Sequence, residues 1–505
     1  METMSEEVMW LSQITYGVLD WLATLFVFFL GLMALVVVVL FFIDVTQKKD
    51  AVRRNYPVIG RFRHMFSQLG EFFRQYFFAM DREEMPFNRA ERDWVYRSSA
   101  GGDNTVAFGS TRNLTPPGTA IFANAPFPAL DEEIHEVDEG VLIGPHCEKP
   151  YLAKSLINIS GMSFGAISKP AVKALSQGAK LANCWMNTGE GGLSKYHLSG
   201  GCDIVFQIGT AKYGVRNPEG GLSEKKLREV AAHPEVKMFE LKLAQGAKPG
   251  KGGLLPGAKI TKRIADIRGI EPGHDSVSPN RHPEVGNNQQ LIDFVDHIRT
   301  LTGKPVGFKT VVGDTEWLST LCEDIVVRGV EHAPDFITID SGDGGTGAAP
   351  MPLMDNVGLT IREALPRVID TLEKHGLRDR IKVIASGKLI TPAEVAWAYC
   401  VGADFVTSAR GFMFSLGCIQ ALKCNKNTCP TGITTHDMRL QRGLVPEEKA
   451  TKVKNFAAKI HYGVGLIAHS CGVSHPRQLE RRHCRIVQSG TESIRLDKLY
   501  PPVED

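Results

Sequence analysis

The sequence predicts an α/β protein built on a (β/α)8 barrel and preceded by one N-terminal transmembrane helix. Two observations favour this fold. Short β-rich runs recur between residues 156 and 408, and each ends in glycine or polar residues before a helical pattern begins. Ahead of them, residues 21–43 form an uncharged apolar run that is long enough to cross a membrane.

Strands that alternate with helices are typical of parallel βα units, and a count of eight favours a closed barrel over an open sheet. Nearly every glycine cluster follows the carboxyl end of a predicted strand, which is where such barrels have their active sites. The predicted strands are 156–159, 184–187, 204–208, 238–243, 306–311, 336–340, 381–385 and 405–408.

Composition narrows the class of protein. The 505 residues are 43% hydrophobic and 23% charged, as in an ordinary globular protein, and the net charge of +2 gives no indication of a nucleic-acid partner. The chain has ten cysteines, and most stand alone in the sequence. That usage favours a reducing compartment over a disulfide framework.

The apolar run at 21–43 predicts a membrane anchor within residues 1–47. A cleaved signal peptide is the alternative, but it requires a basic start, and this run is preceded by Glu2, Glu6, Glu7 and Asp20. Six basic residues follow the run, so the positive-inside rule places the rest of the chain in the cytoplasm. We therefore expect a single-pass membrane protein with a cytoplasmic catalytic domain. The six basic residues are Lys48, Lys49, Arg53, Arg54, Arg61 and Arg63.

Three further segments follow the anchor. Residues 48–150 are predicted to be a juxtamembrane and wrapping segment, 151–440 the barrel, and 441–505 a C-terminal helical extension. Within the first, residues 61–80 mix aromatic and basic side chains. Two interpretations stay open: an amphipathic helix on the membrane surface, or a helix packed on the body of the protein.

Several loops indicate chemistry. The stretches at 386–389 and 409–411 follow the last two predicted strands, where barrels commonly bind a phosphate with backbone N–H groups. Lys309, inside a predicted strand, needs an anionic cofactor atom or an ion-pair partner in the barrel wall. Glu190, between glycines, is either a turn residue or a proton-handling group.

The long loop after the fourth strand contains Gln245, Lys248 and, further on, Arg268. Folded over a site, such a loop would bring cations to a dicarboxylate, which arginine binds in a bidentate manner. The alternative is a solvated basic surface loop.

Cys418, Cys424 and Cys429 cluster within twelve residues, and the last precedes a proline. This arrangement favours an iron–sulfur site, and the lack of a fourth cysteine favours a three-iron cluster. A zinc site completed by His436, or thiols without a metal, are the alternatives.

Six motifs in order over residues 155–475 resemble the synthase domain of the FMN-binding glutamate synthase family. The resemblance implies an FMN-dependent (β/α)8 barrel with a 3Fe-4S cluster, and reductive formation of L-glutamate from 2-oxoglutarate and ammonia through 2-iminoglutarate. The motifs are ISGMSFGAIS, NTGEGG, LKLAQGAKPGKGGLLPG, SGDGGTGAAP, GLRDR and GCIQALKCNKNTCPTGI.

The resemblance also implies roles for single residues. It makes Gln245, Lys248 and Arg268 the 2-oxoglutarate ligands, and it places Glu190 near the flavin, where ammonia arrives. It makes the three clustered cysteines the cluster ligands. The expected catalytic residues are Glu190 and Lys309. The implied flavin contacts are Met162, Ser163, Lys309, Gly344, Gly345, Ser386, Gly387, Arg410 and Gly411.

The chain departs from a full glutamate synthase, since neither a glutaminase domain nor a large C-terminal domain matches it. We therefore expect nitrogen from free ammonia, an amine or a separate glutaminase subunit, and electrons from ferredoxin or another one-electron donor. Two alternatives stay open: a synthase of an N-substituted glutamate such as N-methylglutamate, and a flavin and iron–sulfur electron-transfer subunit without substrate chemistry of its own.

Overall fold

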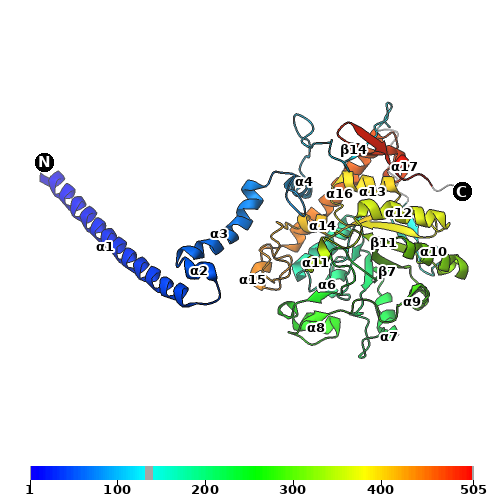
Figure 1. The fold of residues 1–505 in the computed structure, drawn as a ribbon, viewed down its shortest axis with the longest axis horizontal. Coiled ribbons are helices and arrows are strands. Elements are labelled where there is room, and N and C mark those ends of the chain that lie inside the picture. Colours follow the sequence, from blue (N-terminus) through cyan, green and yellow to red (C-terminus); the bar gives the residue numbers. More distant parts are fainter. Residues whose placement is uncertain (1, 131–139, 503–505) are drawn as a thin grey trace. The chain divides into compact units, whose positions relative to one another are not determined.

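The computed structural model describes residues 2–130 and 140–502, and Figure 1 shows them as a ribbon. Residues 131–139 of the predicted wrapping segment, and 503–505 of the predicted extension, lie outside the described residues, as does Met1. The chain divides into two compact units, Met1–Arg89 and Ala90–Asp505. Each unit is described by itself.

The second unit is a closed parallel barrel, as predicted. All eight predicted strands form, and hydrogen bonding joins them in the order β4-β5-β6-β7-β10-β11-β12-β13 and back to β4. Because both faces of each strand are covered, most strand residues are buried and the runs are nearly continuously apolar. The strands are β4 (Ile157–Ile159), β5 (Met186–Asn187), β6 (Ile204–Ile208), β7 (Val236–Lys242), β10 (Val306–Val311), β11 (Phe336–Asp340), β12 (Lys382–Ser386) and β13 (Phe405–Ser408).

Helices surround the barrel (Figure 1). The first, α5, begins where the Ser168 hydroxyl accepts the Ala171 N–H. The last, α16, packs along α5 so closely that a Cβ on Gly178 would lie 2.4 Å from Val453 Cβ. The helices are α5 (Lys169–Leu181), α7 (Glu224–Ala231), α9 (Asn288–Thr302), α10 (Glu316–Arg328), α12 (Ile361–Lys374), α13 (Pro392–Val401) and α16 (Pro446–Ser470).

The position of α16 extends the barrel past the boundary predicted at residue 440. The cysteine loop separates β13 from α16, so the helix that completes the eighth βα unit comes late in the sequence. Short elements lie in the connections of the barrel: α6 (Lys195–Leu198), β8 (Leu254–Leu255), α8 (Lys262–Arg268), β9 (Ser276–Val277), α11 (Met351–Met354), α14 (Arg410–Ser415) and α15 (Met438–Gln441). The helix α4 (Arg89–Ser99) precedes the barrel, and α17 (Leu496–Leu499) follows α16.

A hairpin closes the amino-terminal end of the barrel. Its strands, β2 (Val141–Ile143) and β3 (Tyr151–Ala153), pair antiparallel, and their buried side chains join the same core cluster as Trp185, Phe336 and Phe405. These three lie at or just before the first residues of their strands. The opposite, carboxyl end is the mouth that carries the polar loops.

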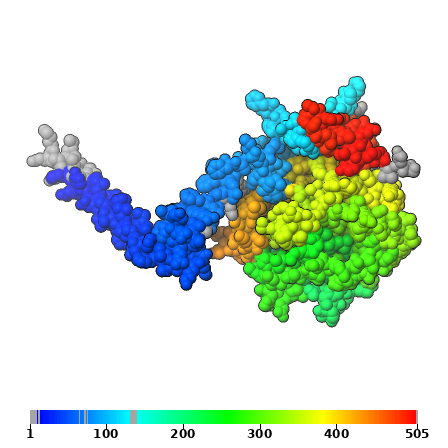
Figure 2. Space-filling view, viewed as in Figure 1, coloured from blue at the N-terminus to red at the C-terminus, as the bar shows by residue number. Residues whose placement is uncertain are grey.

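The predicted C-terminal helical extension is only partly helical. Besides α16, it contains β14 (Cys484–Ser489) and β15 (Glu492–Arg495), which form an antiparallel sheet with β1 (Ala120–Phe122). Figure 2 shows this C-terminal part in red at the surface, beside the yellow part of the barrel. An ion pair of 2.5 Å between Arg481 and Asp370 joins them.

The first unit is helical, with α1 (Glu2–Thr46), α2 (Ala51–Asn55), α3 (Ile59–Phe73) and a π-helix, η1 (Arg74–Phe78). Within α1, residues Gln13–Thr46 are long and apolar enough to cross a membrane, a property that signal sequences share. The described side chains of this stretch are almost all exposed in the protein alone, as a lipid-facing helix would have them.

Candidate active site

The loops after β4 and β5 meet at the mouth of the barrel. Met162 and Ser163 are buried there. Gly189 has a left-handed φ of 63°, and a Cβ on it would lie 2.6 Å from the Ser163 backbone nitrogen. Only glycine permits both the conformation and the approach, which explains the glycines that flank Glu190.

Lys309 lies at the mouth in an ion pair. Its Nζ is 3.2 Å from Oδ2 of Asp340, on the neighbouring strand β11, and the lysine is 6% exposed. The Gly246 N–H also donates to Asp340 Oδ2, over 3.0 Å. The wall ion pair that we considered as an alternative for Lys309 is therefore present, and it holds the ammonium group at the carboxyl ends of β10 and β11.

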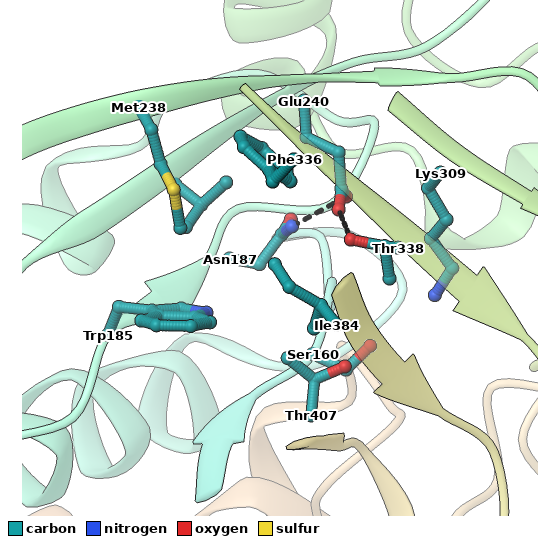
Figure 3. A pocket seen from close by; sticks show the side chains of 11 residues that line it. Ser160, Trp185, Asn187, Met238, Glu240, Lys309, Phe336, Thr338, Ile384 and Thr407 are labelled. Carbon is teal, nitrogen blue, oxygen red and sulfur yellow. Dashed lines mark hydrogen bonds between the residues drawn. The ribbon is translucent and has the colours of Figure 1, made fainter. Parts of the chain in front are cut away.

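Lys309 is one of the residues that line a small pocket inside the barrel (Figure 3). Glu240 is buried there and accepts hydrogen bonds from Asn187 Nδ2 at 2.8 Å, Gln207 Nε2 at 2.7 Å and Thr338 Oγ1 at 2.6 Å. Four strands contribute to this network, so it fixes the register of the barrel interior below the mouth.

Glu190 forms an ion pair of 2.9 Å with Lys242. A Cβ on Gly253 would lie 2.5 Å from Glu190 Oε1, so the glycine-rich loop after β7 passes directly over this carboxylate. Burial alone would raise the Glu190 pKa, but the charges of Lys242, Lys248 and Arg268 outweigh burial and lower it to about 2. Glu190 is therefore a carboxylate at neutral pH.

Lys248 and Arg268 are buried beside that carboxylate. Burial and the charge of Lys242 lower the Lys248 pKa to about 8. Arg268 is 4% exposed, stacks 4.9 Å from the centre of the Tyr213 ring, and donates from one terminal nitrogen to Ser276 Oγ at 3.1 Å. Its Nε has no hydrogen-bond partner among the described residues. Lys248 and Arg268 are thus buried and do not belong to a solvated surface, although other cations of this stretch, such as Lys251, are exposed.

Gln245 faces a different neighbour. Its Nε2 donates to the Gly345 carbonyl over 3.3 Å, and a Cβ on Gly345 would lie 2.8 Å from Arg410 Nε. Arg410 in turn donates to the Thr346 carbonyl over 2.9 Å. The loops after β7, β11 and β13 are therefore in contact at the mouth, with Gly344 in the same turn.

The loops after β12 and β13 are also close-packed through glycine. Gly387 has φ 111°, and a Cβ on it would lie 2.4 Å from Ser341 Cβ, while the Gly411 N–H donates to Ser408 Oγ over 3.2 Å. Ser386 is buried at the end of β12. Gly387 is half-buried, and a glycine backbone after one of the last two strands of such a barrel suits a phosphate group, whereas the Gly411 N–H is buried and already bonded to Ser408.

The three clustered cysteines share the loop after α14. Cys418 and Cys429 are buried and Cys424 is half-buried. Burial, with the nearby thiols of the other two, raises the Cys418 pKa, whereas hydrogen bonds from Thr431 and Thr434 outweigh burial and lower that of Cys429. In kind the three thiols are ligands that iron–sulfur clusters use.

As the side chains lie, however, no group of three or more His, Cys, Asp or Glu residues in the described part of the chain is arranged to hold a metal ion. Lys259, buried, donates from Nζ to the Cys424 carbonyl over 3.2 Å and to the Ala166 carbonyl over 2.8 Å. The Nε2 atom of His436, the alternative zinc ligand, lies 2.9 Å from the Gly165 carbonyl oxygen.

Sequence reasoning missed three charged residues of this site: Glu240, Lys242 and Asp340. All lie within strands and not in the loops that follow them. Their signal was a charged residue inside a predicted strand, the same signal that identified Lys309.

The fold and site define a class: a parallel (β/α)8 barrel with a buried, mainly cationic cluster at its mouth and a cysteine loop after the last strand. The family description "Conserved region in glutamate synthase" matches residues 127–474. The chain belongs to the glutamate synthase family, and with it to the oxidoreductases.

Relatives agree. The glutamate synthase large subunit-like protein YerD of Bacillus subtilis is 41% identical over 94% of this chain and 98% of its own length. The archaeal glutamate synthase (NADPH) of Methanocaldococcus jannaschii is 32% identical over 68% of this chain and 64% of its own. The chain thus spans somewhat less than two thirds of that archaeal relative.

Among solved structures, the flavin-binding domain of baker's yeast flavocytochrome b2 is similar with a TM-score of 0.43 and 12% identity. The match covers 82% of this chain and 84% of that domain.

Proposed function

We propose that this chain forms L-glutamate from 2-oxoglutarate and ammonia by reducing 2-iminoglutarate, with FMN at the barrel mouth and a 3Fe-4S cluster in the cysteine loop. One observation carries the proposal: Lys242, Lys248 and Arg268 surround the single carboxylate of Glu190. Three cations against one anion leave an excess of positive charge, which a dianionic oxo acid would neutralise.

Arg268 is assigned to one carboxylate of the oxo acid. Its Nε lacks a partner among the described residues and one terminal nitrogen is held by Ser276, so donors remain for a bidentate contact. Lys248 is assigned to the same oxo acid, which its positive charge would attract. Gln245 lies in the same loop as Lys248, contacts Gly345 of the loop after β11, and is assigned a neutral hydrogen bond to the substrate.

Glu190 is assigned to ammonia. With a pKa of about 2 it is a weak base, so its role is electrostatic: it attracts ammonium to the mouth and does not retain the proton that nitrogen must lose. Lys242 keeps this carboxylate in place through their 2.9 Å contact.

The flavin assignment follows the glycine-lined loops. Met162, Ser163 and Lys309 would border the ring, Gly344 and Gly345 its edge, and Ser386, Gly387, Arg410 and Gly411 the phosphate. When bound, FMN supplies the hydride that reduces the imine. Asp340 holds Lys309 at the mouth, so that its positive charge stays beside the cofactor.

Cys418, Cys424 and Cys429 are assigned as ligands of the 3Fe-4S cluster, which when bound passes single electrons between an external donor and the flavin. Ferredoxin or another one-electron carrier is the proposed donor, and free ammonia, an amine or a separate glutaminase subunit the proposed nitrogen source. We further propose that α1 anchors the chain in a membrane, with the barrel in the cytoplasm.

Product analysis tests this function. Detergent-solubilised full-length protein is supplied with reduced methyl viologen, 2-oxoglutarate and either ammonium or methylamine, and the products are resolved by chiral chromatography and mass spectrometry. L-glutamate from ammonium is expected. N-methylglutamate as the faster product would favour the N-substituted glutamate synthase, and no amino acid from either amine would favour an electron-transfer subunit.

A further inference from the structure

The first unit carries an exposed apolar stripe along α3 and η1. Apolar residues recur at three- and four-residue intervals from Ile59 to Phe77, so these side chains share one face of the helix. Ile59 is 71%, Phe66 63% and Phe77 69% exposed. The stripe consists of Ile59, Phe62, Met65, Phe66, Leu69, Phe73 and Phe77.

The opposite face of α3 is polar and its charge is mainly basic. Arg63, Ser67 and Gln68 are exposed there, and Arg74 continues this face into η1. Residues 59–78 contain three arginines, of which Arg61 pairs with Asp44, and one acidic residue, Glu71. A narrow apolar stripe beside basic residues is the arrangement of helices that lie in the surface of an anionic membrane.

An ion cluster connects α3 to the end of the apolar helix. Asp44, two residues before the end of α1, is buried. Its carboxylate accepts two hydrogen bonds from Arg53 at 3.0 and 2.6 Å, two from Arg61 at 2.8 and 2.7 Å, and the Val58 N–H at 3.0 Å. The start of α3 is thereby held beside the carboxyl end of α1, the level at which a spanning helix leaves the hydrocarbon.

We propose that Ile59–Phe78 lies in the surface of the bilayer that α1 spans, with the apolar stripe in the outer part of the acyl chains and the basic face toward anionic headgroups. The inference rests on the proposed membrane anchor. At 1.5 Å per residue α3 alone would cover about 22 Å of membrane surface. The ion cluster that joins α3 to the end of α1 and the basic residues beside the stripe both indicate that the partner of the stripe is a lipid surface.

Site-specific photocrosslinking tests this orientation. The photoreactive residue p-benzoylphenylalanine replaces either Phe66, on the stripe, or Gln68, on the polar face, in the full-length protein reconstituted into phosphatidylethanolamine–phosphatidylglycerol vesicles. Both side chains are exposed, so neither replacement disturbs a packed core. We expect lipid adducts at position 66 to exceed those at 68 by roughly tenfold.

Equal lipid labelling at the two positions, or adducts from position 66 to the barrel in place of lipid, would overturn the proposal. Extraction of the same vesicles at alkaline pH separates it from the anchor. Protein released by carbonate would refute the anchor itself. Protein that stays in the membrane but gives no lipid adduct at 66 would refute only the surface helix.

Discussion

Replacement of Arg268 by lysine tests the substrate site most sharply, because it keeps the positive charge and removes the planar fork of donors. Arg268 is 4% exposed, with Nε unpaired among the described residues, so it has donors for two hydrogen bonds to one carboxylate. A lysine in this position would supply one.

The expected loss is one charge-assisted hydrogen bond, about 1.5–3 kcal/mol. This corresponds to a KM for 2-oxoglutarate raised roughly 10- to 150-fold. The assay is the initial rate of glutamate formation against 2-oxoglutarate concentration, with saturating ammonium and an artificial reductant.

Arg263→Lys is the matched control. Arg263 lies earlier on the same helix, α8, is exposed, and contacts Tyr196 through its guanidinium group. We expect its KM to stay within about twofold of the wild type, as for most surface substitutions. A KM for Arg268→Lys equal to that of the wild type would refute the assignment of this arginine to the substrate.

Three further outcomes follow from the same geometry. Because the Lys248 pKa is lowered to about 8, this lysine loses its charge above that pH. The KM for 2-oxoglutarate should then rise by up to about tenfold per pH unit, whereas the KM of Lys248→Arg should not change with pH in this range. A Cβ in Gly253→Ala would lie 2.5 Å from Glu190 Oε1 and would displace this carboxylate. The variant should lower kcat/KM for ammonium by about a hundredfold. An unchanged kcat/KM would mean that ammonium binds elsewhere. Cys424→Ser should lose the iron found by elemental analysis, and Cys400→Ser, a buried thiol in α13, should retain it.

The barrel could be predicted from the sequence because each of its strands is a short apolar run that ends at glycine or polar residues. Even β5, of two residues, was found from the motif that follows it. The boundary of the barrel could not be predicted in the same way, because the cysteine loop intervenes between β13 and α16. The C-terminal hairpin was missed although β14 and β15 flank a glycine turn at Gly490, a pattern typical of hairpins.

The residues of the site were likewise predicted only in part. Lys248, Arg268 and Glu190 were predicted from loops that follow strands, and the structure brings them together. Their partner Lys242 was not predicted, since it lies inside β7 and not in a loop, and its contact with Glu190 depends on how the βα units are arranged. Pairings of this kind depend on strand order and register, which a single sequence does not display.

The central claim is that this chain itself reduces an imine formed at its own barrel mouth. The most direct measurement is an anaerobic single turnover: the full-length protein is reduced, freed of excess reductant, and mixed with 2-oxoglutarate and ¹⁵N-ammonium while the flavin absorbance is followed. The account predicts flavin reoxidation with ¹⁵N-labelled L-glutamate formed in proportion. Flavin that stays reduced, or reoxidation without labelled glutamate, would contradict it.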